Sequence, residues 1–171
     1  MARYVQHVRE PKKLLLAWQA PDEKENRTRF TVGEITRTED GFTLRYHRGT
    51  PDVIKATELS YLGYPAFDLK YEVHTRDVLT AFLRRLPPRS RSDFPEYLRG
   101  LRIGPDAHIS DFALLAYSEA KLPSDGFSLV DTLEDAEIPT EHLMDIAGYR
   151  HYPPRLGPEA IGRPVELVPE P

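Results

Sequence analysis

The front third of the chain alternates apolar with polar residues, a pattern typical of strands that bury one face. An apolar run at residues 14–19 and alternating runs at 29–36 and 42–46 have strand length and are rich in β-branched and aromatic residues. Glu39-Asp40-Gly41 separates the last two runs, and an Asp-Gly pair favours the positive φ angles of a type I′ hairpin turn. We therefore expect an antiparallel meander of three strands. The residues of its third strand that share one face are Phe42, Leu44 and Tyr46.

In the middle of the chain the apolar residues recur at the spacing of a helix. Residues 77–86 carry an apolar stripe formed by Val78, Leu79, Phe82 and Leu86, and Pro87-Pro88 ends it. Three further helices are predicted: one begins at Pro51 and ends by Gly63, one covers 92–98, and one covers 110–117 with Ser110 as its N-cap. A further strand is predicted at 127–130, after the Asp125-Gly126 turn.

These elements predict an α+β fold: a small antiparallel sheet with three to four packed helices, followed by an extended Pro-rich tail or β-ribbon. The tail is expected because prolines become frequent from Pro139 onward. We expect one buried cluster to join the strands and helices. Its members are Trp18, Phe30, Phe42, Leu79, Phe82, Phe112 and Leu115.

The composition narrows the class of protein. The chain has 171 residues, 40% hydrophobic and 29% charged, with a net charge of −4. Nucleic-acid-binding domains usually carry a basic excess, which is missing overall. No apolar leader or membrane span stands out, so we expect a cytoplasmic protein without a membrane partner.

No catalytic or metal-binding set can be assembled from the sequence. There is no cysteine, the six histidines have no metal-ligand spacing, and no serine sits in a Gly-x-Ser-x-Gly elbow. We therefore expect no enzyme activity, no cofactor and no metal ion.

One local charge signal stands out, an arginine-rich stretch beside Pro87-Pro88. Guanidinium groups match phosphate oxygens, so a loop carrying these arginines could touch nucleic acid or an acidic partner. The alternative is a solvated helix end, where cations also complement the helix dipole. The candidate nucleic-acid-binding arginines of this loop are Arg84, Arg85, Arg89 and Arg91. The aromatic residues Tyr61, Tyr64, Phe67 and Tyr71 fit a core or a loop lid better than a base-stacking platform.

Residues 13 to about 131 resemble the small N-terminal subdomain of HipA-type toxin kinases. The resemblance rests on the order of a Val-Gly-Glu-Ile strand, a Gly-Phe-x-Leu-x-Tyr strand, a helix ending Ala-Phe-Leu-Arg-Arg-Leu-Pro, and a helix containing Asp-Phe-Ala-Leu-Leu-Ala. The kinase core has no counterpart here, because the phosphate-binding glycine loop and the catalytic-loop Asp-x-x-x-x-Asn are missing. The resemblance therefore implies an interaction module and not phosphotransfer.

The end of the chain resembles the opening of a HIRAN domain, a small all-β nucleic-acid-binding module. Asp-Ile-Ala-Gly-Tyr-Arg-His-Tyr-Pro-Pro is followed by Val-Glu-Leu-Val-Pro-Glu-Pro, and we expect strands at 146–151 and 165–168. The family captures the 3′ end of single-stranded DNA, and a base stacked on Tyr152 would contribute roughly 1–3 kcal/mol. The positions that match the family's pocket are Arg150, His151, Tyr152 and Glu170.

We accordingly expect a HipA-N-like α+β domain at 1–135, and a linker with the first strands of an incomplete HIRAN-like module at 136–171. The favoured function is a non-catalytic interaction domain that docks a partner protein in a bacterial stress, toxin–antitoxin or phage-defence system. The alternative is a nucleic-acid-binding adaptor that recognises single-stranded DNA through the HIRAN-like part and the arginine loop.

Overall fold

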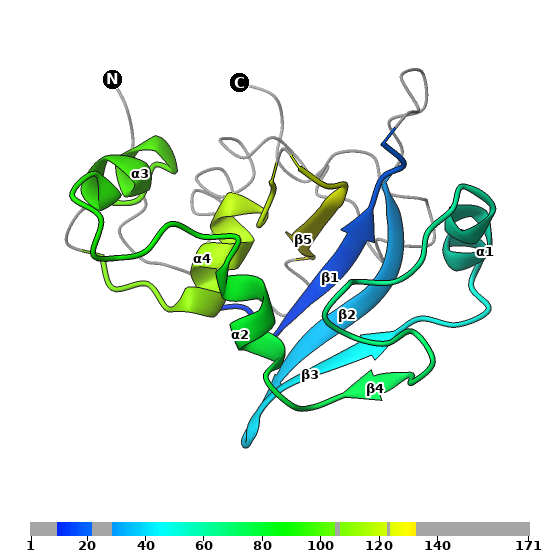
Figure 1. Cartoon of the computed structure of the whole chain (residues 1–171). Coiled ribbons are helices and arrows are strands. Elements are labelled where there is room, and N and C mark those ends of the chain that lie inside the picture. Colours follow the sequence, from blue (N-terminus) through cyan, green and yellow to red (C-terminus); the bar gives the residue numbers. More distant parts are fainter. Residues whose placement is uncertain (1–9, 22–28, 105–106, 123, 133–171) are drawn as a thin grey trace.

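A five-stranded antiparallel sheet lies at the centre of the fold. The computed structural model describes residues 10–21, 29–104, 107–122 and 124–132, and the sheet order is β4-β3-β2-β1-β5 (Figure 1). The strands are β1 (Lys13–Trp18), β2 (Phe30–Thr38), β3 (Gly41–Tyr46), β4 (Val73–His74) and β5 (Phe127–Asp131). The predicted meander of β1, β2 and β3 is confirmed, and the predicted last strand pairs with β1. The sequence pattern missed β4, because two residues are too few to show an alternation.

The hairpin between β2 and β3 forms where it was expected, but its turn is of a different type. Thr38 pairs with Gly41, so Glu39 and Asp40 form a two-residue loop. A type I′ turn needs positive φ at both loop residues. Here neither has it, and Gly41 takes the positive φ of 143° instead. The side-chain-free glycine adopts this angle at little cost, whereas Glu39 and Asp40 would be strained there.

Within the part of the chain that the structure describes, four helices accompany the sheet. They are α1 (Pro51–Glu58), α2 (Val78–Leu83), α3 (Phe94–Gly100) and α4 (Asp111–Ser118). Ser110 caps α4 as predicted, since its hydroxyl accepts a hydrogen bond from the Ala113 amide at 3.0 Å. Helix α2 ends at Leu83, before the predicted Leu86. The chain then continues in tighter i→i+3 turns, in which the amides of Arg85 and Leu86 donate to the carbonyls of Phe82 and Leu83 at 3.0 Å each. Pro87 disfavours helical geometry at Leu86 itself. In the part of the chain that the structure describes, no helix is long and apolar enough to cross a membrane.

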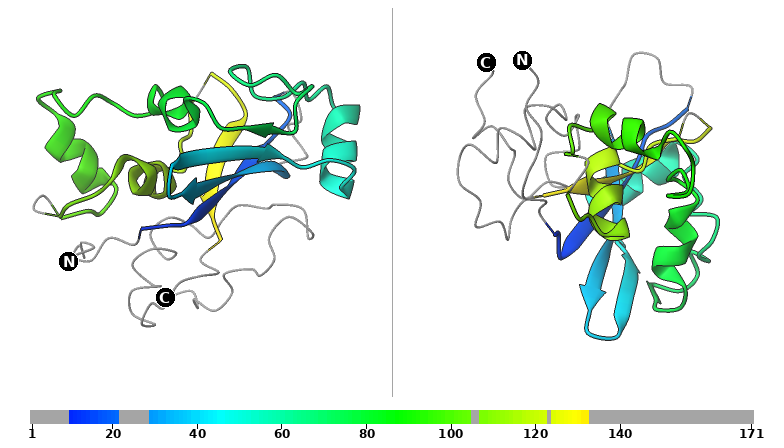
Figure 2. Two further views of the ribbon diagram at one scale, coloured as in Figure 1. Left: turned by 90° about the horizontal axis from the view of Figure 1, so that it is seen from below. Right: turned by 90° about the vertical axis from the view of Figure 1, so that its left-hand side faces the viewer.

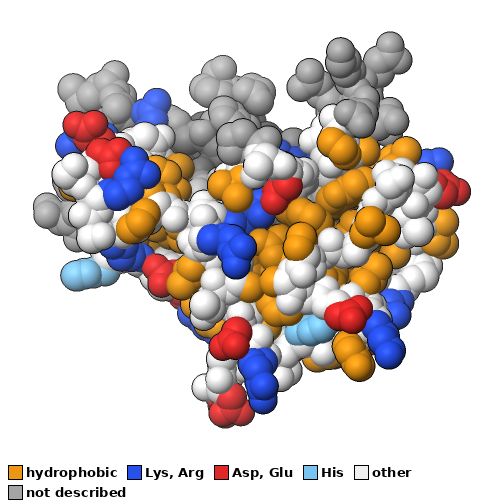
Figure 3. Space-filling model, viewed as in Figure 1, with side chains coloured by type: hydrophobic (Ala, Val, Ile, Leu, Met, Phe, Trp, Pro, Cys, Tyr) orange, Lys and Arg blue, Asp and Glu red, His pale blue; other side chains and the backbone are white. Residues whose placement is uncertain are grey.

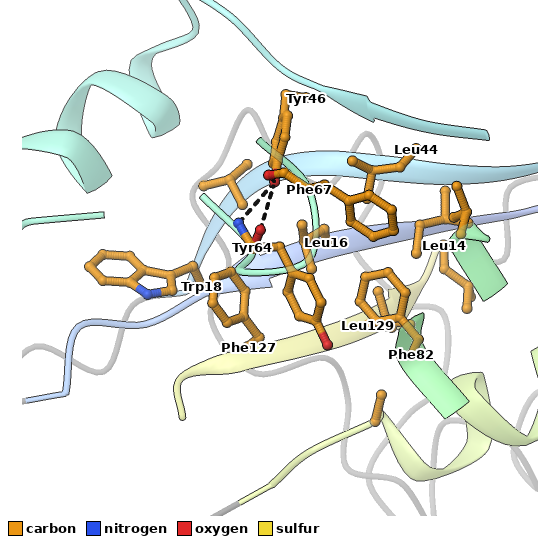
Figure 4. Close-up of a cluster of buried hydrophobic side chains, with 14 of the residues drawn as sticks. Leu14, Leu16, Trp18, Leu44, Tyr46, Tyr64, Phe67, Phe82, Phe127 and Leu129 are labelled. Atoms are coloured by element: carbon orange, nitrogen blue, oxygen red, sulfur yellow. Dashed lines mark hydrogen bonds between the residues drawn. The ribbon is translucent and has the colours of Figure 1, made fainter. Parts of the chain in front are cut away.

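The helices α2 and α4, with the connection between α1 and α2, cover one face of the sheet (Figure 2). The Tyr46 hydroxyl of β3 holds this connection down, because it accepts from the Tyr64 amide at 2.9 Å and donates to the Phe67 carbonyl at 2.7 Å (Figure 4). Tyr61, Tyr64 and Phe67 are buried in the main core, which confirms the core interpretation for these three aromatics, whereas Tyr71 is exposed.

The predicted core is confirmed as one cluster, with two members less buried than expected. Trp18, Phe30, Phe82, Phe112 and Leu115 are buried within it. Phe42 and Leu79 pack against the cluster but are only partly buried. Phe42 lies next to the hairpin turn, where the cover over the sheet ends. The opposite face carries a small separate buried cluster of Leu15, Ala17 and Val130.

Candidate functional site

Arg85 lies in the interior, which corrects the expectation that it sits on an exposed loop. Only 2% of its side chain is exposed. Its Nη1 and Nη2 donate to the two carboxylate oxygens of Asp125 at 2.9 and 2.6 Å, so the pair is bidentate. The guanidinium also donates hydrogen bonds to the carbonyls of Ala120 and Phe127 and to the hydroxyl of Tyr64. The guanidinium therefore ties α2 to the segment that leads into β5.

The surroundings of Arg85 and Asp125 favour the charged forms of both side chains. Burial opposes the charged form of Arg85, but hydrogen bonds to Asp125 and Tyr64 more than offset it, and the pKa of Arg85 is raised. Burial also acts to raise the pKa of Asp125, but hydrogen bonds from Arg85 and the Phe127 amide outweigh it, and the net direction is down. Two separate hydrogen bonds occupy polar groups on the outer edge of β5. The Phe127 carbonyl accepts from Arg85, and the Leu129 amide donates to the Glu119 carbonyl at 2.8 Å.

Arg89 and Arg91 are exposed, and each is paired with a carboxylate. Arg91 donates to both oxygens of Asp93 at 2.9 and 2.6 Å, and this hydrogen bonding raises the pKa of Arg91 and lowers that of Asp93. Arg89 donates through Nε and Nη2 to Asp111 at 3.2 and 2.9 Å. The positive charge predicted for this loop is therefore largely balanced by carboxylates that lie nearby.

Arg84 differs from its three neighbours in the candidate set. Its side chain is exposed. Within the described residues it has neither an ion pair nor a hydrogen-bond partner. The structure therefore does not bring the four arginines together as one phosphate-facing cluster.

A groove of about 560 Å³ runs beside Pro87-Pro88, between the C-terminal end of α2 and the first half of α4. Its lining is formed by Leu83, Arg84, Leu86, Pro87, Pro88, Arg89, Asp111 and Leu114. Leu114 belongs to the buried cluster that α3 and α4 share, and Leu86 packs against both that cluster and the main core. On the face shown in Figure 3, apolar side chains gather mainly over the connection between α1 and α2, and apolar and charged side chains are mixed around α2.

Sequence reasoning identified two arginines of this groove but not the groove itself. The sequence did contain one signal for the groove. Leu83 and Leu86 lie shortly before the proline pair, so apolar side chains are expected where the helix ends. The α4 wall could not be inferred, because Asp111 and Leu114 lie far along the chain.

A second, polar hollow of about 210 Å³ lies where β1 ends and β5 begins. The buried Arg29 points into it and donates from Nη1 to Glu119 at 3.1 Å and to Ser128 at 3.2 Å. Its charge is thus compensated within the fold. Among the described residues, no three histidine, aspartate or glutamate side chains are grouped to hold a metal ion.

The tail candidates Arg150, His151, Tyr152 and Glu170 lie outside the described residues, as do the strands expected at 146–151 and 165–168. Comparison of the chain with protein-family models, with curated proteins and with solved structures finds no match. The resemblance to HipA-type N-terminal subdomains and to HIRAN domains therefore stays a prediction from motif order.

Proposed function

We propose that this chain is a non-catalytic interaction domain that docks a partner protein in the groove beside Pro87-Pro88. The observation that carries the proposal is the make-up of the groove, an apolar floor with charged groups along its rim. Protein interfaces share this arrangement, with an apolar centre and a polar margin.

The pairing of the arginines supports protein docking over nucleic-acid binding. A phosphate group would have to compete with Asp111 for Arg89 and with Asp93 for Arg91. Arg85 is buried and hydrogen-bonded to Asp125, so a phosphate group cannot reach it. Of the four candidate arginines, Arg84 alone lacks a partner among the described residues. One arginine provides little of the counterion release that drives binding to nucleic acid. The HipA-like order of motifs would place such a docking domain in a bacterial stress, toxin–antitoxin or phage-defence system.

A selection of displayed peptides against the purified chain tests the proposal. Leu83 is the residue to change, because it lines the groove and is only partly buried. We expect the selected peptides to lose at least about tenfold in affinity for Leu83→Ser, since part of the apolar floor is removed. Ile54→Ser is the matched control, because Ile54 is an exposed apolar residue of α1 outside the groove.

Two results would contradict docking at this groove. One is that peptides selected on the parent chain bind Leu83→Ser as tightly as the parent. The other is salt-dependent binding of a labelled single-stranded oligonucleotide, with an affinity that falls on replacing Arg84, Arg89 and Arg91 by Ser. The second result would favour the nucleic-acid-binding adaptor.

A further inference from the structure

We infer that the groove takes an acidic, aliphatic segment of its partner, in which a leucine-like side chain stands next to Asp or Glu. This inference rests on the proposed function and specifies the chemistry of the partner. The side chains that line the groove carry an excess positive charge. Two arginines and one aspartate line the groove. Asp111 is already engaged by Arg89, so no carboxylate within the described residues balances the charge of Arg84.

The Arg89–Asp111 pair is held firmly enough to keep this balance. Besides its two contacts to Asp111, Arg89 donates from Nη2 to the Ile109 carbonyl at 2.8 Å, and its guanidinium lies over the Phe94 ring at 5.6 Å. Asp111 stands in the first turn of α4, where a negative charge is favourable beside the helix dipole. A partner carboxylate would therefore meet Arg84, which has no partner in the described part of the chain, whereas Arg89 is already paired with Asp111.

The apolar floor of the groove favours an aliphatic side chain in the partner. Leu83 and Leu86 are partly exposed beside the buried Leu114, so an incoming aliphatic side chain would cover surface that is now open to water. Covering it also excludes water from the neighbourhood of Arg84. A guanidinium–carboxylate contact can be bidentate, and it strengthens as its surroundings become less polar.

The same two features disfavour other occupants of the groove. A basic segment would be repelled by the charge of the exposed Arg84. A phosphate would satisfy Arg84 but would leave the leucine floor uncovered. A purely aliphatic segment would cover the floor, and it would bury a cation without a partner, which is costly.

Fluorescence anisotropy with two labelled peptides tests the inference. One peptide contains only leucine, alanine and glutamate, and the other has lysine at every glutamate position. We expect the parent chain to bind the glutamate peptide at least about tenfold more tightly than the lysine peptide. Arg84→Glu should reverse this preference. Lys55→Glu should leave it unchanged, because Lys55 is an exposed cation of α1 outside the groove. A glutamate peptide with every leucine replaced by alanine should bind more weakly.

The possible failures are distinguishable. Equal affinity for the two peptides, or an unchanged preference in Arg84→Glu, would overturn the acidic chemistry. If display-selected peptides still lost affinity for Leu83→Ser in that case, docking at the groove would stand and only its partner chemistry would be wrong. If Leu83→Ser affected no peptide, the proposed function itself would fail.

Discussion

Replacing Arg85 by Met tests whether the buried guanidinium holds the segment before β5 against α2. Methionine retains much of the apolar stem of arginine but has no donor. The change removes every hydrogen bond that the guanidinium makes to Asp125, Ala120 and Phe127. The partners stay in place, so the result reports the cost of leaving them unpaired.

The magnitude follows from the surroundings of each partner. A buried carbonyl left without a donor costs about 1 kcal/mol at the low end, and the carbonyls of Ala120 and Phe127 both lose one. The Asp125 side chain is 34% exposed and can be rehydrated, so losing its ion pair adds only about 1 kcal/mol. We therefore expect Arg85→Met to lower the free energy of unfolding by about 3 kcal/mol. For a chain of this size, that corresponds to roughly 6–12 °C in melting temperature.

Urea denaturation followed by circular dichroism, analysed by linear extrapolation, measures this change. The control is the adjacent Arg84→Met, which should stay within about 0.5 kcal/mol of the parent because Arg84 is exposed and has no partner among the described residues. Equal stability of the two variants would refute the assignment of Arg85 as an internal tie. So would a larger loss in Arg84→Met.

Four further measurements test the fold. Phe82→Ala should destabilise by about 3–5 kcal/mol, because its ring is 1% exposed in the main core, and a near-parent urea midpoint would contradict that. Ser110→Ala should cost about 1 kcal/mol through loss of the α4 cap, with Ser110→Thr retaining most of the stability. Gly126→Ala should cost about 2 kcal/mol or more, since a β-carbon there would lie 2.1 Å from the Gln19 carbonyl oxygen, and an unchanged melting temperature would rule out this close approach. The lowered pKa of Asp125 contributes stability that is complete above about pH 4 and is lost as the pH falls through the folded-state value, so Asp125→Asn should show a flatter acid limb than the parent.

The sequence alone determined what depends on local periodicity. The strands β1, β2 and β3, the helices α1 and α4, the Ser110 cap and most of the main core were all predictable, because the spacing of apolar residues decides which face of an element is buried. The structure differs from the sequence prediction at two places, the turn between β2 and β3 and the C-terminal end of α2. Gly41 took the positive φ that was expected within the turn, and α2 ended before the proline pair was reached.

The tertiary structure determined which arginines are buried and which are paired with a carboxylate. Arg84 and Arg85 are neighbours in a basic stretch, yet one is exposed and the other is buried, because only Arg85 reaches Asp125, 40 residues further along the chain. The contact between Arg89 and Asp111 likewise spans 22 residues. A sequence shows how many arginines a loop carries, but not which carboxylates the fold brings beside them. Those carboxylates determine which guanidinium groups are already paired. The groove forms only when α2 and α4 pack together, and only the fold shows that Arg84 has no carboxylate partner among the described residues.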